Sequence, residues 1–360
     1  MRRPLVLLLV LVSACSPGSP KARPSATSAP PASAPVSSTP VSPTATATTP
    51  PPDTRGSGNA VTIAFGGDVH FEGASRSALS GGLRAITPLL SAADVTMVNL
   101  ETAITDRGTR APKDFNFRAP ASAFAALRAA GVDVVTQANN HGEDYGEVGL
   151  RDSVAAAKAA RFPVVGIGLD AEQAFAPWRV TVKGQRLAFL GATHVLDSNL
   201  RAAWTARDAK PGLASAYEES RLLAAVRAAR ADSDTVVVYL HWGAERHTCP
   251  IDRQYDIARK LTDAGADIVV GSHAHVLLGA GMRGRAFVSY GLGNFVFYAR
   301  GGLGAETGVL TVTVTGRHVD SYRWAPAVIS GGVPHPLSGG AAEAARRRWA
   351  ALRRCTDLTA

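Results

Sequence analysis

The feature that most constrains the fold is an alternation of short β-branched runs with Ala-rich amphipathic stretches between residues 61 and 330. The runs predicted as strands are Val61–Phe65, Val95–Val98, Val132–Thr136, Val164–Gly168, Leu187–Gly191, Val236–Leu240, Ile268–Val270 and Ala286–Tyr290. The stretches predicted as helices are Ala121–Ala130, Glu147–Ala160, Tyr217–Arg230 and Asp252–Ala264. Strands that alternate with helices predict an α/β domain. Trp178–Val182 and Val309–Thr315 have fewer helices nearby and indicate a mixed sheet or a second packed sheet.

Residues 60–330 contain no internal Pro/Ser linker and are predicted to form one domain, followed by an Arg-rich helical tail over 331–360. The formal net charge of +9 lies mostly at the two ends of the chain. Residues 1–55 carry +4 and residues 340–360 carry +3, which leaves +2 for everything between. A large basic groove for nucleic acid is therefore not expected.

The first residues have the pattern of a secretion signal. Two arginines precede an apolar run of eight residues, Leu5–Val12, which is far too short to span a bilayer. The run ends in Val12-Ser13-Ala14-Cys15, which resembles the lipobox of bacterial lipoproteins, whose cysteine is acylated. We therefore predict a signal peptide over 1–14 and lipidation of Cys15. The alternative is an ordinary secretory signal with an incidental cysteine.

Residues 15–59 are predicted to be a disordered Pro/Ser/Thr/Ala-rich tether, since half of the chain's 22 prolines lie there and few residues can be buried. A lipid followed by a long polar tether predicts a position on the outer face of the cytoplasmic membrane. In that compartment Cys249 and Cys355 either form a disulfide or remain two unrelated thiols.

Polar side chains follow the predicted strands at the points where these strands end, and five of the nine histidines are among them. The residues are Asp68, His70, Asn99, Glu101, Asn140, His141, Asp144, His241, Glu245, His273 and His275. Ligands of open α/β folds bind outside the carboxyl ends of strands, so these side chains are predicted to converge. A single histidine at a strand end is usually a solvated polar residue. Several Asp, Asn and His groups in this one position indicate a metal site.

The candidate ligands form a nitrogen and oxygen donor set without thiolate. They are Asp68, His70, Glu101, Asn140, His241, His273 and His275. Such a set suits Mn, Fe, Zn or Co better than Mg or Ca, which prefer all-oxygen shells. Seven ligands exceed one tetrahedral site, so we predict two divalent ions that share a carboxylate.

These motifs resemble the CapA family, which is named for a role in bacterial poly-gamma-glutamate capsule synthesis. The resemblance covers about residues 61–328. Its motifs are Gly67-Asp68, Val98-Asn99-Leu100-Glu101, Ala138-Asn139-Asn140-His141 with Asp144-Tyr145-Gly146, His241-Trp242-Gly243 with Glu245, Gly271-Ser272-His273-Ala274-His275, and Gly291-Leu292-Gly293-Asn294-Phe295. It implies a relationship to the calcineurin-like metallophosphoesterases, and with it a four-layer α/β/β/α sandwich and a two-metal site.

The resemblance also implies a role for each residue. The ligands of the first ion would be Asp68, His70 and His275, and those of the second Asn140, His241 and His273, with Glu101 as the bridge. The catalytic residues would be His141 and Asp68. Of these, His141 would stabilise the transition state and help to protonate the leaving group. The neighbouring or substrate-contacting residues would be Asn99, Asp144, Glu245 and Asn294. Because CapA members usually carry apolar residues after the first Asp, His70 is either a true ligand or a polar neighbour.

The function predicted from these features is hydrolysis of a phosphoester in the metabolism of an anionic envelope or capsule polymer. The resemblance adds a capsule-synthesis complex as a partner. Two alternatives remain open. The first is a non-catalytic, membrane-anchored factor that binds or tethers an anionic polymer. The second is a metal-dependent gamma-glutamyl amide hydrolase or transferase.

Overall fold

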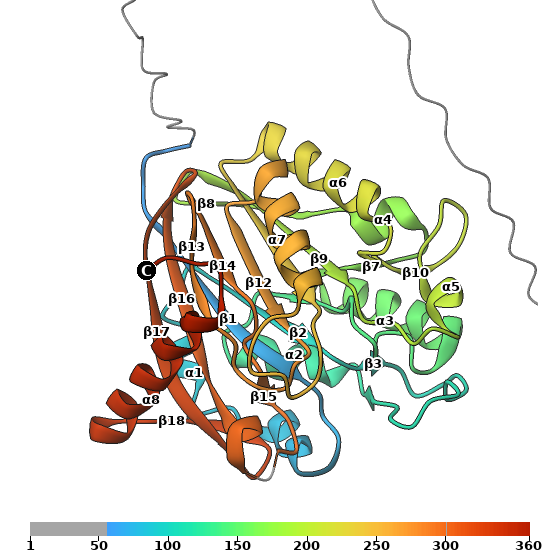
Figure 1. Cartoon of the computed structure of the whole chain (residues 1–360). Helices are drawn as coiled ribbons and strands as arrows, with labels where there is room; N and C mark the ends of the chain where they lie inside the picture. The colour runs from blue at the N-terminus through green and yellow to red at the C-terminus, as the bar shows by residue number, and fades with distance from the viewer. Residues whose placement is uncertain (1–55, 300) are drawn as a thin grey trace, which may run out of the picture. The chain divides into compact units, whose positions relative to one another are not determined.

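A computed structural model describes residues 56–299 and 301–360. The signal peptide predicted for 1–14, the lipid site at Cys15 and most of the predicted tether lie outside the described residues, so these stay predictions. Two large sheets lie at the centre of the described part, and helices lie outside them (Figure 1). None of the helices within the described ranges combines the length and apolar character that a membrane crossing requires.

The first sheet is mixed and has eight strands within the described residues. In spatial order they are β18 (Val333–Pro336), β17 (His318–Ser330), β16 (Glu306–Thr315), β1 (Val61–Val69), β2 (Val95–Leu100), β5 (Val134–Thr136) and β6 (Val164–Val165), with β15 (Asn294–Val296) also paired to β1. β1, β2 and β5 run parallel. Their carboxyl ends therefore meet at one edge of the sheet, as the sequence predicted.

The second sheet has six strands within the described residues. In spatial order they are β13 (Ala280–Arg283), β14 (Ala286–Ser289), β12 (Ile268–Ser272), β11 (Thr235–His241), β9 (Gln185–Thr193) and β8 (Trp178–Val182). The four from β14 to β9 are parallel. Two small sheets pair β3 (Ala103–Ile104) with β4 (Arg118–Ala119), and β7 (Ile167–Gly168) with β10 (Gly212–Leu213).

The two large sheets pack face to face, and helices cover their outer faces. The interface between them is a fully buried apolar layer that includes Phe65, Met97, Val237, Tyr239 and Phe287. The first sheet is covered by α2 (Ser122–Ala129), α3 (Gly146–Ala160) and the 3-10 helix η1 (Gly73–Ser80). The second is covered by α4 (Ala171–Phe175), α6 (Glu219–Asp232) and α7 (Asp252–Ala264). This arrangement confirms the predicted α/β/β/α order of layers.

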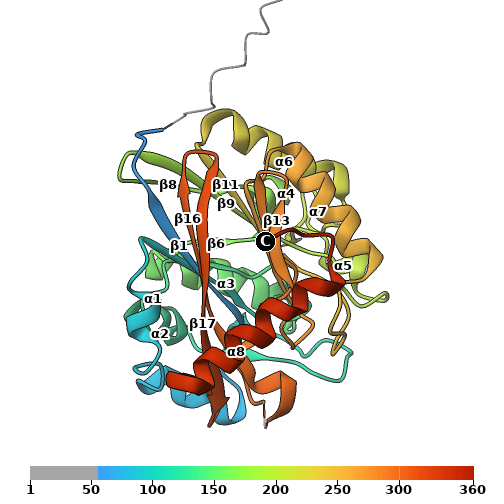
Figure 2. The ribbon, with the colours of Figure 1, turned by 60° about the vertical axis from the view of Figure 1, so that its left-hand side comes forward.

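The remaining helices are short or lie near the C-terminus. They are α1 (Thr87–Leu90), α5 (Arg201–Trp204), η2 (Gly302–Ala305), α8 (Gly339–Ala351) and η3 (Leu352–Cys355). Figure 2 shows α8 lying across β17, where the ring of Trp349 stacks on that of Trp324 with 5.3 Å between centroids. The predicted C-terminal helix is thus packed on the body of the domain.

Two predicted segments differ in kind from the structure, and glycines explain both, while most other predicted bounds shift by a few residues. The predicted strand Val164–Gly168 is divided into β6 and β7, because Gly166 adopts φ 86° and turns the chain. The predicted tail over 331–360 begins with a strand, β18, that belongs to the first sheet. Gly331 and Gly332 both have positive φ and form the two-residue turn that joins β17 to β18.

Candidate metal centre

The residues predicted to converge lie at the carboxyl edges of both sheets, and direct hydrogen bonds join these edges. Asp68, near the end of β1, accepts the backbone N–H of His273, which follows β12, at 3.1 Å. The Tyr239 hydroxyl of β11 donates to the carbonyl of Gly66 at 2.8 Å. Close approach is possible because Gly67 has no side chain: a Cβ there would lie 1.9 Å from the Gly293 carbonyl oxygen.

Two groups of donor atoms share the carboxylate of Glu101. One consists of Asp68, Glu101 and His275, and the other of Glu101, His241 and His273; within each, the donor atoms lie within 4.8 Å of one another. A third such group within the described residues combines Glu245, His273 and His275. The predicted bridging carboxylate thus lies between the predicted ligands of two ions. These residues are brought together, and their roles as ligands remain predictions.

The chemistry of the buried atoms fits divalent cations. Both oxygens of Glu101 are buried without a hydrogen-bond partner, and so is Nδ1 of His273. Glu101 Oε1 lies 3.4 Å from His241 Nε2. A buried carboxylate without a partner is costly, because it loses its hydration and gains nothing in return. Two cations at this position would satisfy its oxygens together with the neighbouring imidazoles.

Asp68 is held as a carboxylate by donors on both of its oxygens. Asn99 Nδ2 donates to Oδ1 at 2.8 Å, and His275 Nδ1 lies 3.4 Å from Oδ2. Burial opposes ionisation of Asp68, but His275 and His241 together keep its pKa well below the usual range. An ionised Asp68 is the form that binds a cation. Asn99 therefore orients this carboxylate, and its Oδ1 in turn accepts from Asn139 at 3.0 Å.

Asn140, His241 and His275 each have a polar neighbour at the ring or amide. Asn140 Oδ1 lies 2.7 Å from His241 Nε2, so these two predicted ligands of the second ion are adjacent. His275 Nδ1 lies 2.8 Å from Asn294 Oδ1, an arrangement that leaves Nε2 available for a cation. Although burial opposes protonation, Glu101 and Asp68 raise the pKa of His275 to about 9.

His70 is placed differently from the other candidates. The backbone N–H of Glu72 donates to His70 Nδ1 at 3.0 Å, which engages the lone pair of that atom, while buried Nε2 has no partner. The ring packs beside Phe117 and Phe297, with centroids 4.6 and 4.1 Å away. Burial, together with charge on neighbouring histidines, lowers its pKa to about 3. Of the two alternatives, this geometry favours a polar neighbour over a ligand.

His141 points its ring toward the centre without joining the donor groups. Its Nδ1 lies 2.6 Å from Asp144 Oδ2, and its Nε2 lies 3.9 Å from Glu101 Oε1. Burial, followed by the positive charge of Lys113, lowers the pKa of His141 well below its ordinary value. Burial raises the pKa of Asp144 to about 7, although Lys113 acts in the opposite direction. The predicted catalytic histidine thus has a carboxylate that fixes its orientation.

Lys113 is a site residue that the sequence did not predict. Its Nζ lies 2.6 Å from Asp144 Oδ1 and 3.3 Å from His141 Nδ1, and it also donates to the carbonyl of Asn140. Lys113 comes from a loop and not from the end of a strand, so the pattern that found the other residues could not find it. The only nearby hint in the sequence was the apolar Phe117, four residues after Lys113, whose ring stacks on that of His141 with 4.1 Å between centroids.

The centre opens into a cleft with a volume of about 810 Å³. Its lining includes His141, His275, Asn140 and Asn294 beside Phe297 and Tyr298. Glu245 is exposed on the wall of this cleft, consistent with the predicted role in substrate contact, whereas Asp68 and Glu101 are fully buried beneath it. A substrate in this cleft would therefore approach the donor groups from the side of His275 and Asn140.

The four layers and the two donor groups that share Glu101 define an α/β/β/α sandwich with a candidate two-cation site at the carboxyl edges of its sheets. Residues 62–299 match the family model described as bacterial capsule synthesis protein PGA_cap, and the chain belongs to this family. This confirms the resemblance to CapA proteins that the motifs indicated.

Among curated proteins, the chain is 32% identical over 217 residues to the PGA biosynthesis protein CapA of Bacillus subtilis (strain 168), a match that covers 59% of this chain and 55% of the relative. It is 34% identical over 221 residues to the capsule biosynthesis protein CapA of Bacillus anthracis, covering 59% and 53%. The chain thus spans about half the length of the curated relatives it matches.

Among solved structures, a protein described as a novel phosphatase of Mycoplasma pneumoniae superposes with a TM-score of 0.48 and 14% identity, covering 75% of this chain and 94% of that one. A 5'-nucleotidase from Candida albicans SC5314 gives a TM-score of 0.42 and 11% identity, covering 81% and 57%.

Proposed function

We propose that this chain is a two-metal hydrolase that cleaves a phosphoester in the metabolism of an anionic envelope or capsule polymer. The observation that carries the proposal is Glu101, a buried carboxylate with two unpartnered oxygens that belongs to two donor groups at once. A shared carboxylate between two His-containing groups is the arrangement that a pair of divalent ions requires. From the donor set, Mn, Fe, Zn or Co would be the ions.

The residues of the site would have separate roles in such a reaction. Asp68 and His275 would hold one ion, His241, His273 and Asn140 the other, and Glu101 both. When bound, two such ions lower the pKa of a water between them and offset negative charge on phosphoryl oxygens. Asn99 keeps Asp68 oriented, and Asn294 does the same for His275.

His141 would act on the leaving group. With Nδ1 engaged by Asp144, the ring presents Nε2 to the cleft. The tautomer that carries its proton on Nε2 would donate to a phosphoryl oxygen and pass that proton to the departing oxygen, while Asp144, whose pKa burial raises to about 7, would return a proton to Nδ1. Lys113 supports this geometry by pairing with Asp144. The stacked ring of Phe117 restricts His141 further and keeps water from one of its faces.

The polymer and the location are proposals that rest on the sequence and on the names of relatives. The relatives in both Bacillus species are named for PGA or capsule biosynthesis, which supports a poly-gamma-glutamate-like polymer and a capsule-synthesis complex as partners. Lipidation at Cys15 would hold the domain on the outer face of the cytoplasmic membrane, with the tether allowing it to reach the polymer.

The test is metal content together with phosphatase activity. The purified chain should retain two divalent ions per molecule and hydrolyse a chromogenic phosphate ester in the presence of Mn²⁺. Asp68→Asn should abolish hydrolysis and lower the metal content, whereas His141→Ala should lower kcat by about 10² to 10⁴ and leave the metal content unchanged. The exposed His318 offers a matched control, and His318→Ala should leave both quantities unchanged. A wild-type chain that binds no metal would show the proposal to be wrong.

A further inference from the structure

A small polar pocket lies near the metal centre, beside the segments that carry Phe117 and Asp144. It has a volume of about 280 Å³, and its charged lining comes from three separate segments of the chain. The residues that matter are Glu72, Arg76, Asp106, Arg110, Arg118 and Tyr145. Arg76 lies on η1, Arg110 on the loop after β3, and Arg118 on β4. The fold thus brings three arginines from separate parts of the sequence to one pocket.

None of these three guanidinium groups has a carboxylate oxygen of the described residues within 4.0 Å. Nearby arginines behave differently: Arg107 pairs with Asp152 at an exposed site. All three side chains are exposed, so water screens their mutual repulsion, and Glu72 and Asp106 line the same pocket. An oxyanion in the pocket would accept charge-assisted hydrogen bonds from guanidinium groups that make no ion pair within the described residues.

Arg118 is already held in place. Its guanidinium carbon lies 5.0 Å from the centre of the Tyr145 ring, a cation–π distance. The backbone N–H of the same residue donates to Glu72 Oε1 at 3.3 Å, which directs that carboxylate toward the main chain. An arginine fixed in this way loses little freedom when it binds an oxyanion through two parallel hydrogen bonds.

The pocket adjoins the metal centre residue by residue. Arg118 follows Phe117, whose ring stacks on His141, and Tyr145 follows Asp144, which hydrogen-bonds His141. Glu72 lies two residues after His70 and lines the pocket. Arg118 and Tyr145 are thus direct sequence neighbours of residues that contact His141, so the backbone of these segments brings the pocket next to the centre.

We propose that this pocket binds a second oxyanion, a carboxylate or phosphate group of the same oligomeric ligand whose phosphoester lies at the metal centre. The inference rests on the proposed function in assigning the phosphoester to that centre. Binding of the oxyanion itself needs only the three arginines. A ligand with several anionic groups on one chain would span both positions, and a ligand with a single charge would not.

The two acids of the pocket allow a second test, in which removal of a negative charge should strengthen binding of the oxyanion. Glu72 is engaged by the Arg118 N–H, but Asp106 is exposed and makes no ion pair within the described residues. It would therefore repel a bound oxyanion. Asp106→Asn should tighten binding, whereas loss of an arginine should weaken it. A role of these residues in folding alone predicts no such opposition.

The experiment measures binding of two labelled probes to the full-length, metal-loaded chain by fluorescence anisotropy. The probes are a γ-linked glutamate tetramer and inorganic tripolyphosphate. The variants are Arg76→Met, Arg118→Met and Asp106→Asn, and the matched control is Arg227→Met, an exposed arginine of α6 on the other sheet. Circular dichroism establishes that each variant is folded.

Each Arg→Met variant should raise the Kd of at least one probe about tenfold, as expected for a charge-assisted hydrogen bond, while Asp106→Asn lowers it and Arg227→Met has no effect. Weakening of the tetramer alone assigns the pocket to carboxylates, and weakening of tripolyphosphate alone assigns it to phosphates. Equal affinities for wild type and all variants, with both probes, would overturn the inference. If this pattern holds but the wild type cleaves no phosphate ester, the proposed function fails and the pocket stands.

Discussion

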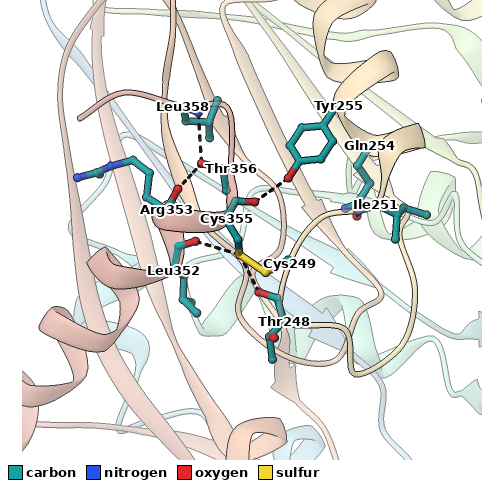
Figure 3. The surroundings of a disulfide bond; sticks show 10 residues. All are labelled: Thr248, Cys249, Ile251, Gln254, Tyr255, Leu352, Arg353, Cys355, Thr356 and Leu358. Carbon is teal, nitrogen blue, oxygen red and sulfur yellow. Dashed lines mark hydrogen bonds between the residues drawn. A yellow bond between two sulfur atoms is a disulfide. The ribbon is translucent and has the colours of Figure 1, made fainter.

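The disulfide between Cys249 and Cys355 closes a long loop, and its removal has a calculable effect on stability. The two residues are separated by 106 positions, and their Cα atoms lie 5.6 Å apart. The bond joins the loop after β11 to η3, as Figure 3 shows, and this settles the alternative left open by the sequence in favour of a bridge. Tyr255 reinforces the junction by donating to the carbonyl of Cys355 at 2.6 Å.

A covalent link of this kind acts mainly on the unfolded chain, whose freedom it restricts. For a closed loop of this length, the chain-entropy model gives a contribution of about 4.7 kcal/mol at 25 °C. The folded state should change little, because the same tail is also held by backbone hydrogen bonds between Met282 and Thr359 and by the Tyr290 hydroxyl, which donates to Asp357. Cys249→Ser/Cys355→Ser should therefore lower the free energy of unfolding by roughly 3 to 5 kcal/mol.

The assay is urea unfolding followed by circular dichroism, in a background in which Cys15 is also replaced by Ser. Either single variant should behave as the double variant does, and dithiothreitol should bring the wild type to the same value while leaving the variants unchanged. Metal content and activity well below the unfolding transition should be unaffected. A loss of less than about 1 kcal/mol would refute the entropic argument, because loop closure at this separation predicts several times more.

Three further results are expected. Burial raises the pKa of Glu143 to about 8 against a usual 4.5, so as pH rises Glu143 loses its proton in the unfolded chain before it does in the folded chain. Glu143→Gln should therefore have the same free energy of unfolding as wild type near pH 4 and a free energy about 3 kcal/mol higher at pH 7. A difference that shrinks between these two pH values would contradict this. Glu101→Gln should lower metal retention yet stabilise the metal-free chain by about 1–3 kcal/mol, since it removes a buried, unpartnered carboxylate; calorimetry with and without chelator measures both. His141→Ala should keep its metals while kcat falls by about 10² to 10⁴, and a change confined to KM would argue against a role in proton transfer.

The regular elements followed from local patterns. α7 and β8 have the predicted bounds, Asp252–Ala264 and Trp178–Val182, because clear periodicity and good boundary residues coincide there. α7, for instance, ends where Gly265 adopts φ 113°. The long strand β17 was not predicted, because the consecutive polar residues Asp320 and Ser321 and the presence of Pro326 weaken the apolar/polar alternation that indicates a strand. Its pairing with the neighbouring strands β16 and β18 decides its conformation.

The candidate site was predictable to the extent that its residues follow strands. Asp68, Glu101, His241, His273 and His275 were found in this way, and the structure gathers all five into donor groups. Lys113 was missed because a loop brings it to the site and its role depends on Asp144. The pocket of arginines was equally invisible, since nothing in the sequence relates η1 to β4 in space.

The placement of His70 shows why strand periodicity alone misleads at such a site. In a regular strand Asp68 and His70 would share a face, and this was the basis for expecting both as ligands. The register of β1 shifts at this point, between Phe65 and Asp68 against β2 and between Asp68 and Val69 against β15.

His273 and His275 depart from regular geometry as well, with φ of 98° and 55°. Non-glycine residues in the left-handed region cost energy and persist where surrounding contacts hold them. The hydrogen bond from His273 N–H to Asp68 is one such contact. The irregular backbone thus places His70 outside the three donor groups, while the Asp68 carboxylate holds the backbone of His273 from the other sheet beside them.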